Sequence, residues 1–490
     1  MVEDISNSVK SHFFDPKNVG KMEHPSAIGT AGSIEECGDL VKIFIRVESF
    51  RIADISFLAE GCPSAIASSS MTTEIAKGLS IFEASMITGD DINSALGGLP
   101  DNKLSCSNLG ATALKSALEN FVSSDSFIEM PKERQRTAVA MSGGVDSSTV
   151  AALLKNEGKE VVGLTMRLHD STVAGQVDNR SCCSPEDIDD AWLVSKNLNI
   201  PHFTVDLRKA FKKHVIDDFY NEYTKGRTPN PCIQCNRKIK FTTLKSISEK
   251  LGANQLATGH YVKIAFDEVA KRFQVKIARD RSKDQSYMFW GADQGVLRSF
   301  IAPLGDYNKK EVRSVADRLG LSVAKKAESQ EICFIPDNDY RSFLIDRGYD
   351  PKPGPIIDKE NRSLGTHKGL PFYTVGQRKG LGIANNTPFY VTDILPDDNT
   401  LVVGGIADFE KDSLIAKELN FIPFDGLIED FEVEVKYRYN MEPVPAKIFP
   451  IADDAVKVEL KSKSDTGIAP GQSVVFYVDD LVIGGGIIYN

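Results

Sequence analysis

The sequence predicts a multidomain protein in which three architectures follow one another: α+β, α/β with a parallel sheet, and all-β. Residues 1–126 combine strand-like alternation with later helical segments. From residue 137 onward, short apolar strands alternate with helices, which is typical of a doubly wound parallel sheet. Beyond residue 349 the segments become short, β-branched and separated by Gly, Asn and Asp, which predicts β-structure.

Hydrophobic periodicity places the elements of the first two units. In the first unit we expect strands at 40–47 and 52–58 and helices at 64–77 and 111–121. A polar stretch at 127–136 is interpreted as a linker. The second unit, 137–348, is expected to contain strands at 137–141, 161–166, 202–205 and 256–261 and helices at 149–156 and 186–198.

The rest of the chain is expected to form two β units. These are a small central domain, 349–407, and a C-terminal β-barrel, 408–490. The strand signal is carried by 390–394, 400–403, 431–439, 446–449, 456–460, 473–477 and 481–483.

Composition narrows the class of protein. A net charge of −10 argues against a general nucleic-acid coat but allows a local basic patch. The apolar runs are too short to span a bilayer and no signal peptide is visible, so we expect a cytoplasmic protein without a membrane partner. In such a protein, eight cysteines indicate metal binding or sulfur chemistry rather than a disulfide framework.

A glycine- and serine-rich loop at Ser142–Ser148 lies between an expected strand and an expected helix. Gly143 and Gly144 allow close approach of an anion to the backbone, and the helix start offers unpaired N–H groups. Asp146 suits a Mg²⁺ ion that accompanies phosphates. The string SGGVDSS lacks the Walker ending and resembles the PP-loop of ATP pyrophosphatases, enzymes that adenylate a substrate and release pyrophosphate. The alternative is a plain turn that caps a helix.

Three cysteines extend this resemblance. Cys232 and Cys235 lie in the string NPCIQCNRK, and Cys333 lies in ESQEICF. With the loop, these strings resemble the tRNA-specific 2-thiouridylases, the MnmA family, over residues 137–490. The resemblance implies a PP-loop catalytic domain, a small central domain and a C-terminal β-barrel. It also implies that Cys235 is the nucleophile and Cys333 the persulfide-bearing cysteine.

The same resemblance implies two sets of binding residues. ATP is expected on Ala140, Met141, Ser142, Gly143, Gly144, Val145, Asp146, Ser147, Met166 and Gly259. Contacts with tRNA are expected at Asn230, Pro231, Cys232, His260, Lys283, Asp284, Gln285, Arg438, Tyr439 and Gln472. Tyr373, Tyr437 and Tyr439 would either stack on unpaired bases or belong to a β core.

One residue departs from the family pattern. Many members have aspartate at the position of Cys232. Cys232, Cys235 and Cys333 could together hold an iron–sulfur cluster, with one iron of a [4Fe–4S] cluster open to sulfide. Structural zinc, or a spare thiol beside a working persulfide pair, are the alternatives. Cys182 and Cys183 are interpreted as partly exposed thiols without a catalytic role.

A second cysteine set precedes the linker. Cys37, Cys62 and Cys106 with Asp39 could form a four-ligand metal site. The pattern resembles the IscU/NifU-type iron–sulfur scaffolds over residues 11–121, although Ser105 replaces the usual histidine. A cluster of [2Fe–2S] or [4Fe–4S] type, zinc, or an empty scaffold kept for docking remain open. Scaffold pairing would make a homodimer.

These features together predict an enzyme. ATP would adenylate the 2-carbonyl of the wobble uridine in tRNA, and sulfur would replace the oxygen. The expected partners are tRNA and a cysteine desulfurase or another sulfur donor. A linked scaffold could pass on a cluster or sulfide at high effective concentration. The rivals are a non-catalytic iron–sulfur carrier that binds tRNA and another PP-loop activity on tRNA.

Overall fold

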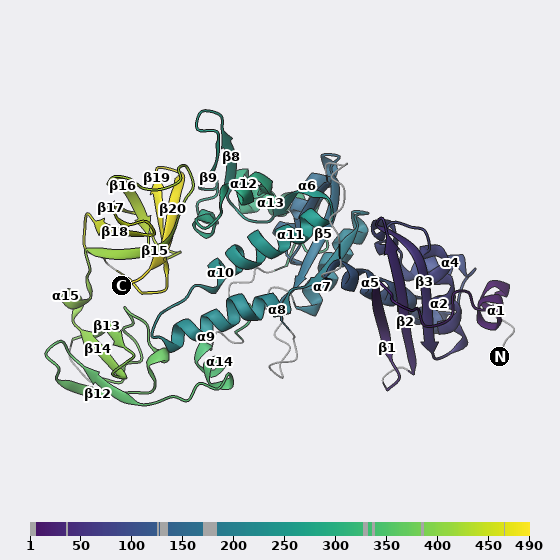
Figure 1. Ribbon diagram of the computed structural model, residues 1–490, viewed down its shortest axis with the longest axis horizontal. Helices are drawn as coiled ribbons and strands as arrows, with labels where there is room; N and C mark the ends of the chain where they lie inside the picture. Colours follow the sequence, from purple (N-terminus) through teal and green to yellow (C-terminus); the bar gives the residue numbers. More distant parts are fainter. Residues whose placement is uncertain are drawn as a thin grey trace.

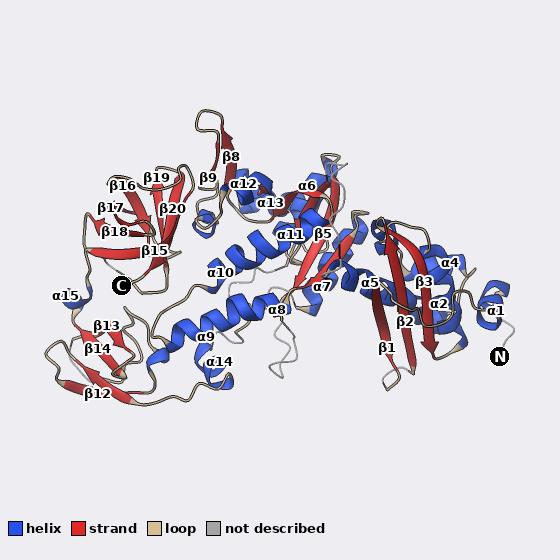
Figure 2. Ribbon diagram, viewed as in Figure 1, coloured by secondary structure: helices blue, strands red, loops and turns tan. Residues whose placement is uncertain are grey.

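The computed structural model describes residues 6–35, 38–124, 127, 136–169, 184–326, 332–335, 339–383, 387–464 and 466–490. Cys37, Cys182 and Cys183 lie outside these residues. The described strands form sheets of three, five, four and eight strands. Figures 1 and 2 show the three-stranded sheet at one end, the five-stranded sheet in the middle and the two β units at the other end. Among the described helices, none combines the length and apolarity needed to span a bilayer.

The first unit is an antiparallel sheet backed by helices. Its strands are β1 (Ala27–Ser33), β2 (Asp39–Glu48) and β3 (Arg51–Glu60), in this order. Its helices are α1 (Asn7–Phe14), α2 (Pro63–Ala76), α3 (Ile81–Ser85), α4 (Gly89–Ala95), η1 (Asp101–Lys103) and α5 (Leu104–Val122). Strand β1 was not predicted, because its small residues carry no hydrophobic signal. Gly29 there lets α5 pack closely, since a Cβ would lie 2.0 Å from the Ala113 carbonyl oxygen.

The second unit contains the predicted parallel sheet. Its order is β10-β7-β4-β5-β6, and neighbouring strands pair in parallel. The strands are β4 (Arg136–Ala140), β5 (Glu160–Arg167), β6 (His202–Asp206), β7 (Ala253–Thr258) and β10 (Phe300–Ile301). The helices around the sheet are α6 (Val145–Asn156), α7 (Pro185–Asn197), α12 (Gln294–Ser299), α13 (Lys309–Arg318), η5 (Ser286–Phe289) and η6 (Pro303–Asp306). The central strand β4 therefore leads directly into the predicted phosphate loop.

Two long helical segments extend from this sheet toward the β units (Figure 1). One consists of α8 (Arg208–Phe211), η3 (Lys212–Ile216) and α9 (Asp217–Thr224). The other consists of α10 (Pro231–Gln234), η4 (Cys235–Leu244) and α11 (Lys245–Lys250). Both contain π-helical turns, η3 and η4, which often occur at functional sites. The second segment carries Cys232 and Cys235 at its beginning.

The β units have separate sheets. After α14 (Tyr340–Asp346), the central unit has the order β12-β11-β14-β13. Its elements are β11 (Gly354–Ile357), β12 (Ser363–His367), η8 (Leu370–Phe372), β13 (Tyr390–Leu395), β14 (Thr400–Gly404) and α15 (Ile406–Phe409). The last unit contains β15 (Ser413–Phe421), β16 (Phe431–Lys436), β17 (Val444–Ala452), β18 (Ala455–Leu460), β19 (Ser473–Val478) and β20 (Leu481–Ile488).

The last six strands close into a barrel, because β15 pairs with both β18 and β20. A hairpin of the second unit, β8 (Lys263–Asp267) and β9 (Arg272–Lys276), adds two strands to this sheet. Strand β9 pairs with β20 through Val275 and Val482. The catalytic unit and the barrel are therefore joined by backbone hydrogen bonds as well as by the chain.

The first unit is docked on the edge of the parallel sheet. Edge strand β6 donates its Thr204 N–H to Glu119 Oε1 of α5 at 3.0 Å and its Asp206 N–H to Oγ of Ser123, the C-cap of α5, at 3.2 Å. Phe82 packs edge-on against Phe203, and the Arg136 guanidinium lies 3.9 Å from the Phe82 ring centroid. Buried apolar side chains of both units belong to one continuous cluster. The contact resembles a shared core more than a loose tether.

This docking predicts joint unfolding of the two units. Phe82→Ala removes a buried ring from the shared core and should destabilise both units by about 3 kcal/mol. Urea unfolding, followed by far-UV circular dichroism and by tryptophan fluorescence from Trp192 and Trp290 in the second unit, should give coincident transitions in the unchanged chain. Two separate transitions, with the second unaffected by the substitution, would contradict the shared core.

A buried histidine at the same edge predicts a pH dependence. Burial, with a smaller contribution from nearby Lys115, lowers the pKa of His202 to about 3. An unfolded histidine has a pKa of about 6.5, so below that pH only the unfolded chain takes up the proton. Stability should fall as pH decreases, by about 2 kcal/mol at pH 5 from this residue. Urea unfolding at pH 7 and pH 5 should show a smaller loss in His202→Gln; an equal loss would refute the assignment.

Candidate nucleotide site, cysteine loop and metal site

The predicted phosphate loop lies at the carboxyl end of β4. Ser142 donates its N–H to Ser147 Oγ at 3.1 Å, and Ser147 Oγ lies 3.3 Å from the Gly144 carbonyl oxygen. Gly143 has a φ of 68°, and a Cβ there would lie 2.2 Å from the Asp187 carbonyl oxygen. Only glycine fits this position. The loop is a compact turn that leads from β4 into the start of α6, and the N–H groups at a helix start suit an anion.

Two more predicted ATP residues lie beside the loop. Gly259 follows β7, and a Cβ on it would lie 2.8 Å from the Ser147 backbone nitrogen. Met166 is buried near the carboxyl end of β5, next to β4 in the sheet. The structure thus gathers the loop, Gly259 and Met166 at the edge where open α/β sheets bind ligands. Their contact with ATP stays a prediction.

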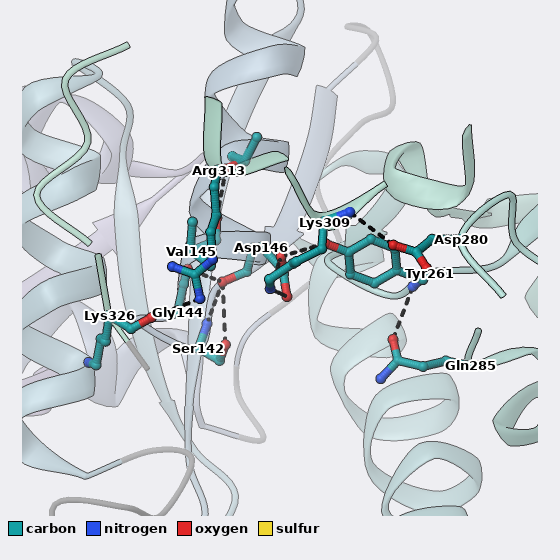
Figure 3. Close-up of polar contacts among 12 residues, drawn as sticks. Ser142, Gly144, Val145, Asp146, Tyr261, Asp280, Gln285, Lys309, Arg313 and Lys326 are labelled. Atoms are coloured by element: carbon teal, nitrogen blue, oxygen red, sulfur yellow. Dashed lines mark hydrogen bonds and ion pairs between the residues drawn. The ribbon is translucent and has the colours of Figure 1, made fainter. Parts of the chain in front are cut away.

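Asp146 of the loop is the centre of a polar cluster (Figure 3). Lys309 Nζ lies 2.8 Å from both carboxylate oxygens of Asp146, and Tyr261 donates its hydroxyl to Oδ1 at 2.9 Å. The side chain of Lys309 is only 12% exposed, so this ion pair is shielded from bulk water. A carboxylate and an ammonium group at a phosphate loop can serve a metal ion and phosphate oxygens, respectively.

Two residues support this cluster: Asp280, which was not predicted, and Gln285, whose predicted contact with tRNA stays a prediction. Asp280 Oδ2 accepts the Lys309 backbone N–H at 3.0 Å. Gln285 Oε1 accepts the Tyr261 N–H at 3.0 Å, and the Gln285 N–H returns to the Tyr261 carbonyl at 2.8 Å. Lys309 is separated from Asp146 by 163 positions, so no motif spacing connects them. The N-cap of α13 by Asn308 was the only local signal, and it indicates a helix start rather than a ligand site.

The cysteine loop begins at the start of α10. Asn230 caps this helix by accepting the Ile233 N–H at 3.2 Å, and Pro231 occupies its first turn. Cys232 is exposed and Cys235 is partly buried, and their spacing of three residues places them on one helix face. Burial, with contributions from Asp284 and Cys232, raises the pKa of Tyr439. Cys232 therefore lies close to a tyrosine of the barrel.

Cys333 lies near the same helices. Cys235 and Cys333 both pack against the large hydrophobic cluster. The neighbouring Phe334 has its ring centroid 5.7 Å from Phe211 and 5.4 Å from Phe219, on the helical segment that contacts η4. The structure thus places both cysteines around one pair of helices. Their catalytic roles stay a prediction.

The cysteine helix reaches the nucleotide site. Segment α10–α11 ends next to the start of β7, so it runs antiparallel to that strand and begins on the carboxyl side of the sheet. Lys240 Nζ, in η4, lies 3.4 Å from His260 Nε2, and Thr258 Oγ1 lies 2.8 Å from His260 Nδ1. Burial and nearby Lys240 hold the pKa of His260 well below its usual range. His260 is therefore neutral and is packed between the two sites.

Several predicted tRNA residues also join the units of the chain. Gln472 donates to the carbonyl oxygens of Thr228 and Pro229, just before the cysteine loop, at 3.0 and 3.3 Å. Arg438 donates to Val375 O of the central unit at 3.4 Å, and the Tyr439 hydroxyl donates to Asp284 O of the second unit at 3.0 Å. Gln472 thus fixes the cysteine loop against the barrel, while Arg438 and Tyr439 join the barrel to the other two units. The contacts of all three with tRNA stay predictions.

The remaining members of this set lie nearby or in the core. Asp284 accepts from the Ala278 and Ser286 backbones, and burial raises its pKa. Lys283 precedes it in a turn closed by its N–H to Asp280 O. Tyr373 and Tyr437 are buried, so of the two alternatives for these residues the structure supports β core.

The first unit contains a separate ligand cluster. Cys62 Sγ lies 3.5 Å from Cys106 Sγ and 3.6 Å from Asp39 Oδ2, and Cys106 Sγ lies 3.9 Å from the same oxygen. Cys62 is the N-cap of α2 and Cys106 lies in the first turn of α5, which starts earlier than predicted. Burial, reinforced by Cys62 and Asp39, raises the pKa of Cys106. A cation would relieve this crowding of acidic groups.

Among the described residues, this trio is the group whose ligand atoms all lie within 4.8 Å of one another. The residues present fit a thiolate-ligated metal or cluster. Cys232, Cys235 and Cys333 do not form a second such group in the described part of the chain.

Family profiles agree with this division of the chain. Residues 4–126 match a NifU-like N terminal domain, and residues 135–337 match a tRNA methyl transferase HUP domain. Residues 341–405 match a tRNA methyl transferase PRC-barrel domain and residues 411–488 an aminomethyltransferase beta-barrel domain. The fold and sites therefore define a NifU-like domain joined to a HUP-domain nucleotide-binding protein with two β domains.

Whole-chain similarity identifies the family. The chain is 40% identical to the "Bifunctional protein NifU/MnmA" of Rubrobacter xylanophilus over 100% of this chain and 99% of that protein. It is 46% identical to the "tRNA-specific 2-thiouridylase MnmA" of Carboxydothermus hydrogenoformans over 72% of this chain and 98% of that protein. The chain belongs to the MnmA family and carries an N-terminal NifU-like domain.

The Asp146–Lys309 ion pair predicts that loss of the Lys309 cation weakens nucleotide binding. Lys309→Met removes the cation beside the loop and should weaken ATP binding by about tenfold, the loss of one charge-assisted hydrogen bond. Lys309→Arg should restore part of this affinity. Equilibrium binding of a non-hydrolysable ATP analogue measures both variants. Lys310→Met, at the next position, is the matched control, and an equal loss there would reject the specific role of Lys309.

Proposed function

We propose that the protein uses ATP to replace the 2-oxygen of the wobble uridine in tRNA with sulfur. The observation that carries the proposal is the contact between the cysteine helix and the nucleotide site. Lys240, five positions after Cys235, lies 3.4 Å from His260, which follows Gly259, the glycine that packs against the loop at Ser147. One catalytic unit thus combines a site that suits ATP with a site that suits sulfur. The names of its curated relatives support the same reaction.

The residues divide the chemistry between them. The loop binds the phosphates of ATP, and Asp146 holds the Mg²⁺ ion that offsets their charge. Uridine O2 attacks the α-phosphorus and pyrophosphate leaves, which converts a poor leaving group into AMP. The terminal sulfur of a cysteine persulfide then attacks C2, and AMP departs. At this point the transferred sulfur still joins uridine C2 to the Sγ atom of the first cysteine. The thiolate of the second cysteine of the Cys235–Cys333 pair attacks that Sγ atom and breaks the S–S bond. The products are 2-thiouridine and a Cys235–Cys333 disulfide.

The substrate surface extends over the barrel. Asn230, Cys232 and Tyr439 lie around the cysteine loop, where a flipped base can enter. Lys283 and Gln472 add cationic and amide groups for the RNA backbone. A cysteine desulfurase or another persulfide donor supplies the sulfur. The proposed domain boundaries are 1–126, 137–348, 349–407 and 408–490. The NifU-like unit binds a metal or cluster on Asp39, Cys62 and Cys106, completed by Cys37.

The reaction order predicts a partial reaction. Cys235→Ala should abolish 2-thiouridine but still release about one pyrophosphate per tRNA, because adenylation precedes sulfur transfer. Asp146→Asn should reduce both steps by about a hundredfold or more. Pyrophosphate release and mass spectrometry of digested tRNA provide the two readouts. No tRNA-dependent pyrophosphate from the unchanged protein would indicate a carrier and reject the proposal.

The persulfide route and the cluster route predict different iron contents for the protein. The alternative route holds a cluster on Cys232, Cys235 and Cys333, so scaffold iron must first be removed with Asp39→Asn and Cys62→Ala in the full chain. The persulfide route predicts no iron in this chain after anaerobic purification, with thiolation retained from a persulfide donor. About four irons per chain that are lost on adding Cys232→Ala would instead establish a cluster on the loop.

A further inference from the structure

Helix α7 connects the NifU-like unit with the phosphate loop. At its beginning, the Asp187 carbonyl lies so close to Gly143 that a Cβ there would approach it to 2.2 Å. Five positions later, Trp192 faces the NifU-like unit. An α-helix rises 1.5 Å per residue, so these two contacts lie only about 7 Å apart along the helix. A shift of α7 at one contact is therefore felt at the other.

The beginning of α7 is held rigidly. Ser184 and Asp187 form a capping box, with the Asp187 N–H bonded to Ser184 Oγ at 3.2 Å. Lys326 Nζ donates to Asp187 Oδ1 at 2.6 Å and also bonds to Asp190. Arg313 donates to the Ala324 carbonyl and so supports the segment that carries Lys326. The loop contact thus moves with the helix.

The NifU-like unit contacts the second half of α7 through a partly buried cation. Lys115 Nζ on α5 lies 5.2 Å from the centroid of the Trp192 ring and 3.9 Å from Glu119 Oε1. Glu119 in turn accepts the Thr204 N–H of β6. Burial lowers the pKa of Lys115, while the nearby carboxylates of Glu119 and Asp189 oppose this shift. The Lys115 side chain is 25% exposed, so its ammonium group is only partly shielded from water beside the indole, and this shielding strengthens a cation–π contact.

Next to this contact, on the side of α4, the interface opens into a groove. A groove of about 540 Å³ separates the units, lined by Thr88 and Asp90 on one side and by Trp192, Lys196 and His202 on the other. Lys196 reaches across it to Asp90 at 3.3 Å, at the surface. Ala191 and Val194 bury the inner face of α7 against the parallel sheet. On the face toward the NifU-like unit, Trp192 has Lys115 at 5.2 Å and Lys196 at 5.7 Å from its ring centroid, and Lys115 is the one of the two that comes from the NifU-like unit.

We propose that the docked NifU-like unit positions the phosphate loop through α7, with Lys115 as the positioning residue. The proposal adds regulation to the nucleotide site of the proposed function. Lys115 holds Trp192, Trp192 fixes the rotation of α7, and the first turn of α7 fixes Gly143. ATP affinity then depends on docking of a domain that does not itself touch the nucleotide.

The test is ATP binding to the full chain, measured without tRNA or a sulfur donor. Lys115→Met keeps the aliphatic stem but removes the cation, and should weaken binding of the ATP analogue by about fivefold, the lower range of coupling between sites. Lys115→Arg should restore binding, because guanidinium also binds over indole. The matched control is Lys17→Met, a lysine of the same unit paired with Asp15 at the surface. Equal affinity in Lys115→Met and the unchanged chain would overturn the proposal.

A double-mutant cycle separates positioning from general destabilisation. Trp192→Leu should weaken ATP binding as Lys115→Met does, and the double variant should be no weaker than either single variant. Additive losses would overturn the proposed path. In steady-state thiolation, KM for ATP should rise about fivefold while kcat changes little. If the unchanged chain does not thiolate tRNA, the proposed function fails, but the binding measurements still decide this inference.

Discussion

The edge strand β6 imposes the constraint on which the arrangement of the units depends. An open parallel sheet ends in strands whose outer N–H groups need partners away from water. Here Glu119 and Ser123 of the NifU-like unit accept those of Thr204 and Asp206. Once these bonds form, α5 lies along the sheet edge, Phe82 meets Phe203, and Lys115 reaches Trp192. A backbone requirement of one unit thus determines the position of the other.

The docked position of the NifU-like unit limits how its metal site can reach the cysteine loop of the same chain. A flexible tether would let the NifU-like metal site approach the cysteine loop of its own chain. In the structure, the parallel sheet lies between α10 and the NifU-like unit (Figure 1). The expected linker, 127–136, begins at Phe127, which packs on Phe50 and Phe121, and ends at Arg136, which already belongs to β4. The expectation that the two sites approach freely across a linker is therefore not supported by this arrangement.

Much of the fold and half of the site followed from local sequence signals. The strand–loop–helix of the nucleotide site and the parallel sheet are confirmed, because buried strands and glycine turns have strong local signatures. The trio Asp39, Cys62 and Cys106 was likewise grouped correctly. Lys309 and Tyr261 were missed because they meet Asp146 only through tertiary packing. Strand β1 was missed because packing against α5 selects small residues there.

Strand β20 pairs with β15 and β19 of the barrel and also with β9 of the second unit. The hairpin β8–β9 belongs to the catalytic unit, yet its pairing partner begins at Leu481, near the end of the chain. During synthesis, the NifU-like unit and the parallel sheet can fold while the barrel is still inside the ribosome. The outer edge of β9 stays without its strand partner until β20 has been synthesised and has left the ribosome. A part of the molecule that is translated early is thus completed only by a strand that is translated much later.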